Sequence, residues 1–111
     1  MRYRKCFLAG VLVAGVLAST TSPVLAATFT AINVPGATST QAFGINERSQ
    51  IVGFYFDGVG ELHGFLLDRG TFTTIDAPGA TSTEALGINA GGQIVGRYFA
   101  GGREHGFVLG R

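Results

Sequence analysis

Apolar residues in the second half of the chain come in short runs separated by turn residues. Residues 71–76, 84–88, 93–99 and 104–109 form runs of five to seven positions rich in β-branched, aromatic or aliphatic side chains. The runs are separated by segments rich in glycine, asparagine or proline, which stop strands and favour turns. These runs predict β-strands, and nothing after residue 26 has the periodicity of an amphipathic helix.

The same pattern occurs twice. Phe72 lies 43 residues after Phe29, and each is followed in the same order by Gly-Ile-Asn, Gln-Ile-Val-Gly and His-Gly-Phe. Repeat one spans residues 29–70 and repeat two spans residues 72–111. In repeat one the run 51–56 is apolar or small on both faces, which predicts a strand sandwiched between neighbouring sheets. Repeat two has an arginine at one of these positions, so we expect one face of its sheet to be wetter, as at the end of an array.

Four short strands per period of this length are typical of a β-propeller blade. The predicted fold is all-β, with two tandem four-stranded antiparallel repeats that are blade-like. It is not a closed ring as a monomer, because rings take about four to eight blades. A lone strand at residues 29–33 comes first, a set of four follows over residues 42–76, and three strands finish the chain. The lone strand can complete the last three within one chain or between chains. A truncated array and a small two-sheet protein are the alternatives.

The first residues have the order of a secretory signal peptide. A cationic start with Arg2, Arg4 and Lys5 precedes an uncharged apolar run at residues 6–18, and small residues lead to Ala26. That order defines a signal peptide, and the run is shorter than the ~20 residues of a spanning helix. We assign residues 1–26 to the signal and residues 27–111 to a β-repeat domain. The predicted protein is secreted or periplasmic, with no membrane span after cleavage.

Removal of the signal changes the charge and the thiol content. The whole chain carries a net charge of +1, but beyond residue 26 five Arg oppose seven Asp and Glu. The mature part therefore lacks the basic surface that binds nucleic acid. Cys6 is the only cysteine and lies within the signal, which excludes a disulfide, a cysteine nucleophile and a cysteine metal site from the mature domain. We expect no cofactor.

The repeated motifs resemble a known family. The stretches Gly-Ile-Asn, Gln-Ile-Val-Gly and His-Gly-Phe, twice in this order, are similar to the HAF family of extracellular repeats. The resemblance covers both repeats, with His-Gly-Phe in place of the family's His-Ala-Phe. It implies an exported bacterial repeat protein with no established activity, and it supplies no catalytic residues.

Four side chains are candidate ligand-binding positions: Tyr55, His63, Tyr98 and His105. A repeated histidine can hold a ligand or a metal on each blade. Neither histidine has a second ligand at metal spacing, so we predict no metal site and favour a hydrogen bond from each histidine to a neighbouring turn. The tyrosines can form a platform for sugar rings, but core packing is the more common role of aromatic side chains in such strands.

Other polar loops are interpreted as turns. Residues 57–61 resemble a poor calcium loop, but Ala100 replaces Asp57 in repeat two, so turn chemistry explains the loop better. Asn46 and Asn89 suit left-handed turns and bond their own backbone.

We predict a non-catalytic, exported β-repeat protein with an interaction or assembly role, because the scaffold residues repeat and no catalytic constellation is present. The expected partner is a second copy of the chain, a glycan or another protein. One alternative is a carbohydrate-binding, lectin-like module formed by oligomeric ring closure. It requires an exposed tyrosine or histidine with polar groups converging on one pocket per blade. The other alternative is an exported hydrolase, which requires a paired acid and base in one cleft.

Overall fold

The chain folds into a curled, open β-sheet. The computed structural model describes residues 26–110, in which there are seven strands and no helix. Contacts divide the chain into Met1–Ala31 and Ile32–Arg111, and every described strand belongs to the second unit. The signal peptide predicted at residues 1–26 lies, apart from Ala26, outside the described residues. Within them, no helix has the length and apolar character needed to cross a membrane.

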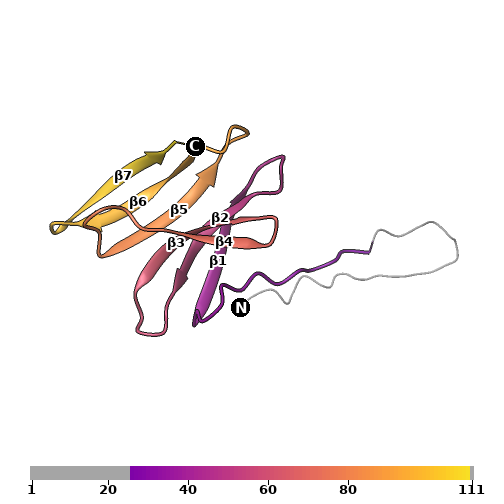
Figure 1. Cartoon of the computed structure of the whole chain (residues 1–111), viewed down its shortest axis with the longest axis horizontal. Coiled ribbons are helices and arrows are strands. Elements are labelled where there is room, and N and C mark those ends of the chain that lie inside the picture. Colours follow the sequence, from indigo (N-terminus) through magenta and orange to yellow (C-terminus); the bar gives the residue numbers. More distant parts are fainter. Residues whose placement is uncertain (1–25, 111) are drawn as a thin grey trace, which may run out of the picture. The chain divides into compact units, whose positions relative to one another are not determined.

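The strands of each repeat form an antiparallel meander. Repeat one and the residues after it supply β1 (Ser39–Ile45), β2 (Ile51–Phe56), β3 (Leu62–Asp68) and β4 (Thr71–Ile75), which pair in that order (Figure 1). Repeat two supplies β5 (Ser82–Ile88), β6 (Ile94–Ala100) and β7 (Arg103–Leu109). The predicted all-β, blade-like fold is therefore confirmed.

The lone strand predicted at residues 29–33 is wrong. These residues have no strand assignment. They correspond to residues 72–76, most of which lie in β4, and β4 is fixed by its pairing with β3. The described chain has no equivalent of β3 before residues 29–33, so β-branched composition alone does not produce a strand there.

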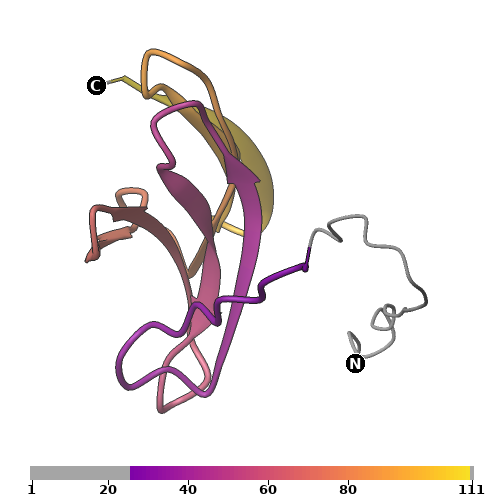
Figure 2. The ribbon, with the colours of Figure 1, turned by 90° about the vertical axis from the view of Figure 1, so that its right-hand side faces the viewer.

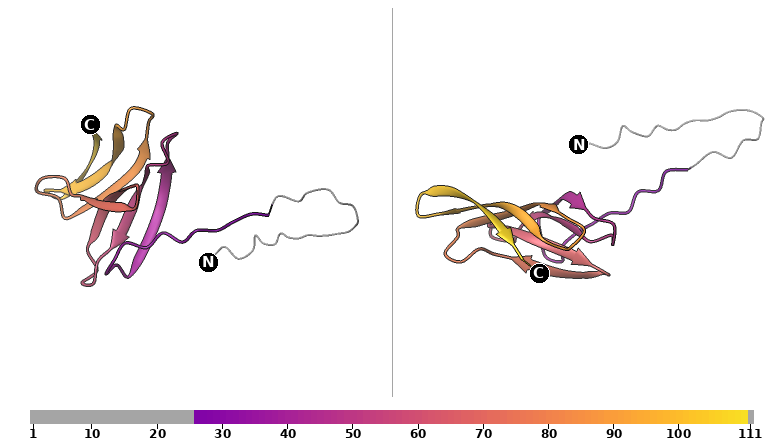
Figure 3. Two further views of the ribbon diagram at one scale, coloured as in Figure 1. Left: turned by 45° about the vertical axis from the view of Figure 1, so that its right-hand side comes forward. Right: turned by 90° about the horizontal axis from the view of Figure 1, so that it is seen from above.

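Repeat two packs on one face of repeat one. A single parallel bridge joins β3 to β5, and β5 also contacts β1 and β2. The buried cluster between the repeats consists of Val52, Leu66, Ala85 and Ile94. Figure 2 shows the curl of the sheet, and Figure 3 shows β5, β6 and β7 beside β1 to β4. The largest buried cluster therefore lies at the contact between the repeats, whereas Phe65, which is also fully buried, packs edge to face on Phe72 of β4.

Burial along β2 and β6 follows the packing of the repeats. Val52 is fully buried and Phe54 is 9% exposed, whereas Ile51 on the opposite face of β2 is only half-buried. The predicted sandwich is therefore complete on one face of β2 only. In β6, Val95 is 47% exposed and Arg97 also reaches solvent. This confirms that one face of repeat two is wetter.

Two asparagines hold the turns and connect the repeats. Asn46 Oδ1 accepts hydrogen bonds from the backbone N–H groups of Arg48 and Gln50, each at 3.0 Å. Asn89 Oδ1 accepts one from Gln93 at 2.9 Å, which confirms that both asparagines bond nearby backbone. The left-handed residues of these turns are Ser49 and Gly92 rather than the asparagines. Asn46 Nδ2 also donates to the backbone oxygen of Asn89 at 3.0 Å. This bond joins equivalent turns of the two repeats.

Close approach of β1 and β2 requires glycine at position 53. A Cβ atom there would collide with the backbone oxygen of Gln41 and lie 2.9 Å from the Cα atom of Ala42. We predict that Gly53→Ala lowers the free energy of unfolding by about 2 kcal/mol and the melting temperature by roughly 8–16 °C, because paired backbone cannot move aside. Thermal unfolding followed by circular dichroism measures this. Gly58→Ala is the control, since nothing lies within 4 Å of that position. Equal losses in the two variants would contradict the prediction.

Candidate functional site

Two carboxylates hold His63 at one end of the repeat-one sheet. His63 lies in β3, Asp57 lies in the turn before β3, and Asp76 directly follows β4. His63 Nε2 is 2.8 Å from Asp57 Oδ2, and His63 Nδ1 is 2.7 Å from Asp76 Oδ1. A protonated imidazole donates from both nitrogens, so this geometry fits His63 as a cation between two anions. We call Asp57, His63 and Asp76 the His63 clamp.

The turn between β2 and β3 positions Asp57. Asp57 Oδ1 accepts hydrogen bonds from the backbone N–H groups of Val59 and Glu61, each at 2.9 Å. Gly60 has a φ of 88°, which glycine adopts without a steric penalty. The turn chemistry predicted for residues 57–61 is confirmed, and it leaves the second carboxylate oxygen of Asp57 for His63.

The clamp shifts the proton affinities of its members. The hydrogen bond with Asp57 raises the pKa of His63, Asp76 raises it further, and partial burial opposes both. The hydrogen bond with His63 lowers the pKa of Asp57, and the backbone N–H of Glu61 lowers it further. His63 therefore keeps its proton to a higher pH than a free imidazole does.

Each predicted tyrosine lies beside the predicted histidine of its own repeat. The ring centroids of Tyr55 and His63 are 5.2 Å apart, with planes tilted by 31°. Those of Tyr98 and His105 are 4.9 Å apart and stacked at 22°. Strand pairing causes both contacts, because the two members of each pair are directly opposite across an antiparallel ladder. Each tyrosine thus presents part of its ring to a histidine, and the two pairs lie in different repeats.

His105 has a different environment from His63. Its Nε2 lies 3.3 Å from the backbone oxygen of Ala100, because Ala100 occupies the position of Asp57. Among the described residues, none lies beside His105 as Asp76 lies beside His63. Both histidines make the predicted hydrogen bond to a neighbouring turn, but only His63 is held by carboxylates.

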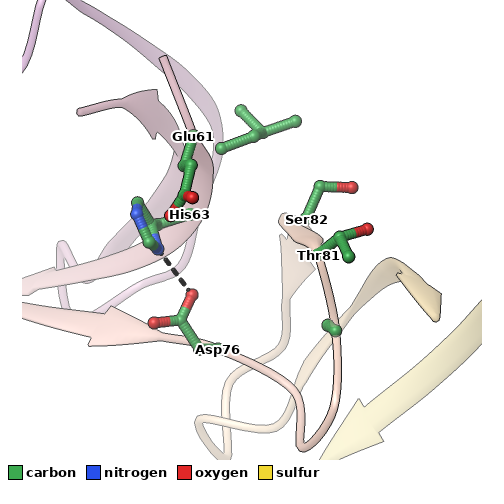
Figure 4. A pocket seen from close by; sticks show the side chains of 7 residues that line it. Glu61, His63, Asp76, Thr81 and Ser82 are labelled. Atoms are coloured by element: carbon green, nitrogen blue, oxygen red, sulfur yellow. Dashed lines mark hydrogen bonds and ion pairs between the residues drawn. The ribbon is translucent and has the colours of Figure 1, made fainter. Parts of the chain in front are cut away.

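A polar hollow of about 380 Å³ opens beside the clamp. Its lining consists of Glu61, Leu62, His63, Asp76, Ala80, Thr81 and Ser82. Figure 4 shows His63 and Asp76 joined on one side of it, with Thr81 and Ser82 on the facing side, where the loop enters β5. The hollow lies between the end of the repeat-one sheet and the start of repeat two.

The clamp limits what the hollow can do chemically. A histidine acts as a general base only through a nitrogen lone pair, and both nitrogens of His63 point at carboxylates. His63 in this state has no lone pair with which to activate the hydroxyl of Ser82. The arrangement is that of an ion-paired link between the β2–β3 turn and the end of β4.

Three of these groups also have the types and spacing of metal ligands. Ligand atoms of Asp57, Glu61 and His63 lie within 4.8 Å of one another, the one such group of three found in the described residues. A divalent ion would have to replace the direct contact of Asp57 with His63. In repeat two Arg103 stands in place of Glu61, so the group is specific to repeat one.

We predict that Asp57→Asn lowers the pKa of His63 more than Asp76→Asn does, because Asp57 makes the larger contribution. Proton NMR of the imidazole C–H groups across pH measures this. Asp68→Asn is the control. It removes a carboxylate that lies in β3 and bonds to Gln50 rather than to His63, so we expect the titration of His63 to be unchanged.

The same shifts fix how stability depends on pH. A raised pKa of His63 means that its contribution is complete below the ordinary value of 6.5 and is lost as pH rises through the raised value. A lowered pKa of Asp57 means that its contribution is complete above 3.8 and is lost as pH falls through the lowered value. The stability advantage of the wild type over His63→Gln is therefore greatest between these limits. An advantage that grows at alkaline pH would contradict the ionic clamp.

Comparison with protein-family models, curated proteins and solved structures finds no match for this chain. The HAF resemblance stays a prediction, and the contacts of the chain itself provide the basis for a functional proposal.

Proposed function

We propose that this chain is an exported, non-catalytic β-repeat protein that binds a partner through the two open faces at the ends of its repeat stack. The HAF-like motifs and the predicted signal peptide support export. The state of His63, with both nitrogens facing carboxylates, supports a structural rather than a catalytic role for the most polar site.

The observation that carries the proposal is a contrast in burial between equivalent residues. Val52 is 0% exposed beneath repeat two, whereas its equivalent Val95 is 47% exposed. Leu66 is 2% exposed, whereas its equivalent Val108 is 67% exposed. Val95 and Val108 are directly opposite on β6 and β7, so they share one face. We call the face of repeat two formed by Val95, Phe99 and Val108 the tail face.

The opposite end of the stack has a matching open face. Ala85 and Ile94 of repeat two are fully buried against repeat one. Their equivalents in repeat one are Ala42, which is exposed, and Ile51, which is half-buried. Ile45 pairs with Ile51 and is 64% exposed. We call the face formed by Ala42, Ile45 and Ile51 the head face.

These open faces are apolar enough to drive binding. Full burial of a valine or isoleucine side chain stabilises by roughly 1.5–3 kcal/mol relative to leaving it exposed. Contiguous exposed apolar patches on soluble proteins mark interaction sites more often than isolated apolar residues do. Both faces present the side-chain types that are buried between the repeats of this chain.

A carbohydrate-binding module is the second candidate function. The polar hollow beside the His63 clamp supports it, because Glu61, Asp76, Thr81 and Ser82 offer hydrogen-bonding groups on both sides of one space. The requirement of one pocket per blade is not met in the described residues. The hollow of repeat two has a different lining, in which Arg97 bridges two glutamates.

A glycan array separates the second candidate from the first. Carbohydrate binding predicts a bound glycan whose signal falls at least tenfold in Thr81→Ala, because a lost hydrogen bond to a buried ligand group costs more than about 1.4 kcal/mol. Thr38→Ala alters the equivalent threonine of repeat one and serves as control. Absence of any bound glycan would remove this candidate.

To test the open-face proposal, the mature chain, residues 27–111, is immobilised. It is then exposed to a mixture of free mature chain and the other exported proteins of the producing cells. We expect a bound protein whose retention falls at least tenfold in Val108→Glu and in Ile45→Glu, because each places a carboxylate in an apolar interface. Val59→Glu is the control, since Val59 is 82% exposed and lies on neither face. Equal retention by all variants, or no retained protein, would overturn the proposal.

A further inference from the structure

We propose that the partner is a second copy of this chain, bound head to tail. The head face of one copy packs on the tail face of the preceding copy. Residues 28–33 of the copy that supplies the head face pair with β7 of the copy that supplies the tail face, in the way that β4 pairs with β3. This inference rests on the proposed function, because it assigns the occupant of the same two faces.

The outer side of β7 is an available edge. β3 pairs with β2 on one side and with β4 on the other. β7 is the equivalent strand of repeat two, and in the described residues it pairs with β6 alone. An edge strand presents backbone N–H and C=O groups to which an extended segment can add. β7 carries two charged residues at its start, Arg103 and Glu104, but residues 105–109, which lie opposite the incoming segment, contain no charged residue and no proline, the usual devices that protect an edge.

The repeat supplies a segment of matching sequence. Residues 28–33 read Thr-Phe-Thr-Ala-Ile-Asn, and residues 71–76 read Thr-Phe-Thr-Thr-Ile-Asp. The two segments differ only where Ala31 replaces Thr74 and Asn33 replaces Asp76. Phe29 and Ile32 therefore occupy the positions of Phe72 and Ile75, the two apolar residues of β4.

The internal pairing also fixes the register between copies. Thr73 of β4 lies opposite Leu66 of β3. The equivalents of these residues are Thr30 and Val108, so Thr30 of one copy lies opposite Val108 of the other, and the neighbouring pairs follow the same offset. Asn33 then occupies the position of Asp76 and faces His105. A neutral amide suits His105, because the Nε2 of His105 bonds to the backbone oxygen of Ala100 rather than to a carboxylate.

The loop that follows the segment already has the required shape. After β4, the backbone N–H of Ala77 donates to Thr83 Oγ1 at 3.1 Å. After residues 28–33, the backbone N–H of Val34 donates to Thr40 Oγ1 at the same distance. The two turns also share a backbone hydrogen bond. The N–H of Ala80 donates to the oxygen of Ala77, and the N–H of Ala37 donates to the oxygen of Val34, each at 3.1 Å. The segment therefore precedes β1 through the same turn through which β4 precedes β5.

This connection makes the acceptor another copy. In the chain, β4 completes the blade on which β5 packs. By equivalence, residues 28–33 complete the blade that covers the head face of repeat one. Repeat two of the same chain occupies the other face of repeat one, where it buries Val52 and Leu66. Since repeat two of the same chain cannot also cover the head face, we assign the blade on that face to a second copy.

The one cation on the tail side does not oppose this packing. Arg97 replaces Phe54, but its guanidinium is bridged by Glu84 at 3.0 Å and Glu104 at 3.1 Å. The incoming copy therefore need not supply a counter-charge. Head-to-tail contacts use different surfaces on the two molecules, so they close into a ring or extend as a filament. A ring of about four to eight blades corresponds to two to four copies.

Disulfide trapping tests the register. The mature domain has no cysteine, so Thr30→Cys and Val108→Cys are made in separate chains of different tag mass, mixed and oxidised. Residues opposite in an antiparallel pair have Cβ atoms about 4.5–5.5 Å apart, close to disulfide geometry. We expect a linked heterodimer in at least tenfold excess over that formed by Thr30→Cys with Val59→Cys, whose cysteine lies in an exposed turn. Circular dichroism confirms that each variant is folded.

The outcomes separate this inference from the proposed function. A yield equal to the control overturns the second-copy inference, even if the immobilised chain still retains another protein through Val108 and Ile45. A chain carrying both cysteines that links within one molecule at low concentration also overturns it. Light scattering of the wild type gives a further check. The mass of a single chain at all concentrations contradicts head-to-tail assembly. A mass of two or more chains that is lost on deletion of residues 27–33 supports it.

Discussion

The structure depends on the stacking of one repeat on the next. A single repeat is a small sheet with apolar positions on both faces, and alone it has nothing to bury them against. The completely or almost completely buried side chains of the central cluster, Val52, Leu66, Ala85 and Ile94, come equally from the two repeats. Other features serve this contact. Gly44 allows close approach, since a Cβ atom there would lie 3.3 Å from the Cα atom of the equivalent glycine of β5.

Most of the fold was predictable because it follows from local chemistry. Strand positions follow from runs of β-branched and aromatic residues, and strand ends follow from glycine and asparagine at turns. The one wrong strand, at residues 29–33, has the composition of β4 but not its neighbour. A strand exists through hydrogen bonds to another strand, and composition does not reveal whether that other strand is present. The apolar faces of residues 51–56 predicted that sheets stack on each other, but the sequence did not reveal which faces meet.

The site was half predictable for a related reason. Comparison of the repeats identified the tyrosine and histidine pairs, because both repeats have them. The same comparison discounted Asp57, which repeat two replaces with Ala100. Asp76 was detectable from the short turn after β3. Arg69 and Gly70 both have positive φ and form a two-residue hairpin turn, whose register places the residue after β4 opposite His63.

The sequence repeat and the structural blade are offset from each other, and this offset explains the ends of the stack. β4 completes the blade of repeat one but begins the sequence of repeat two. In the described residues, the two repeats therefore provide one complete blade, the three strands β5, β6 and β7, and a β4-like segment at residues 28–33. The segment at residues 28–33 and the outer edge of β7 are complementary because they repeat the sequence patterns of β4 and β3. A sheet edge without charge or proline is a hazard to a protein that works alone. The charges of β7 are confined to Arg103 and Glu104, and residues 105–109 leave the rest of its outer edge without this protection.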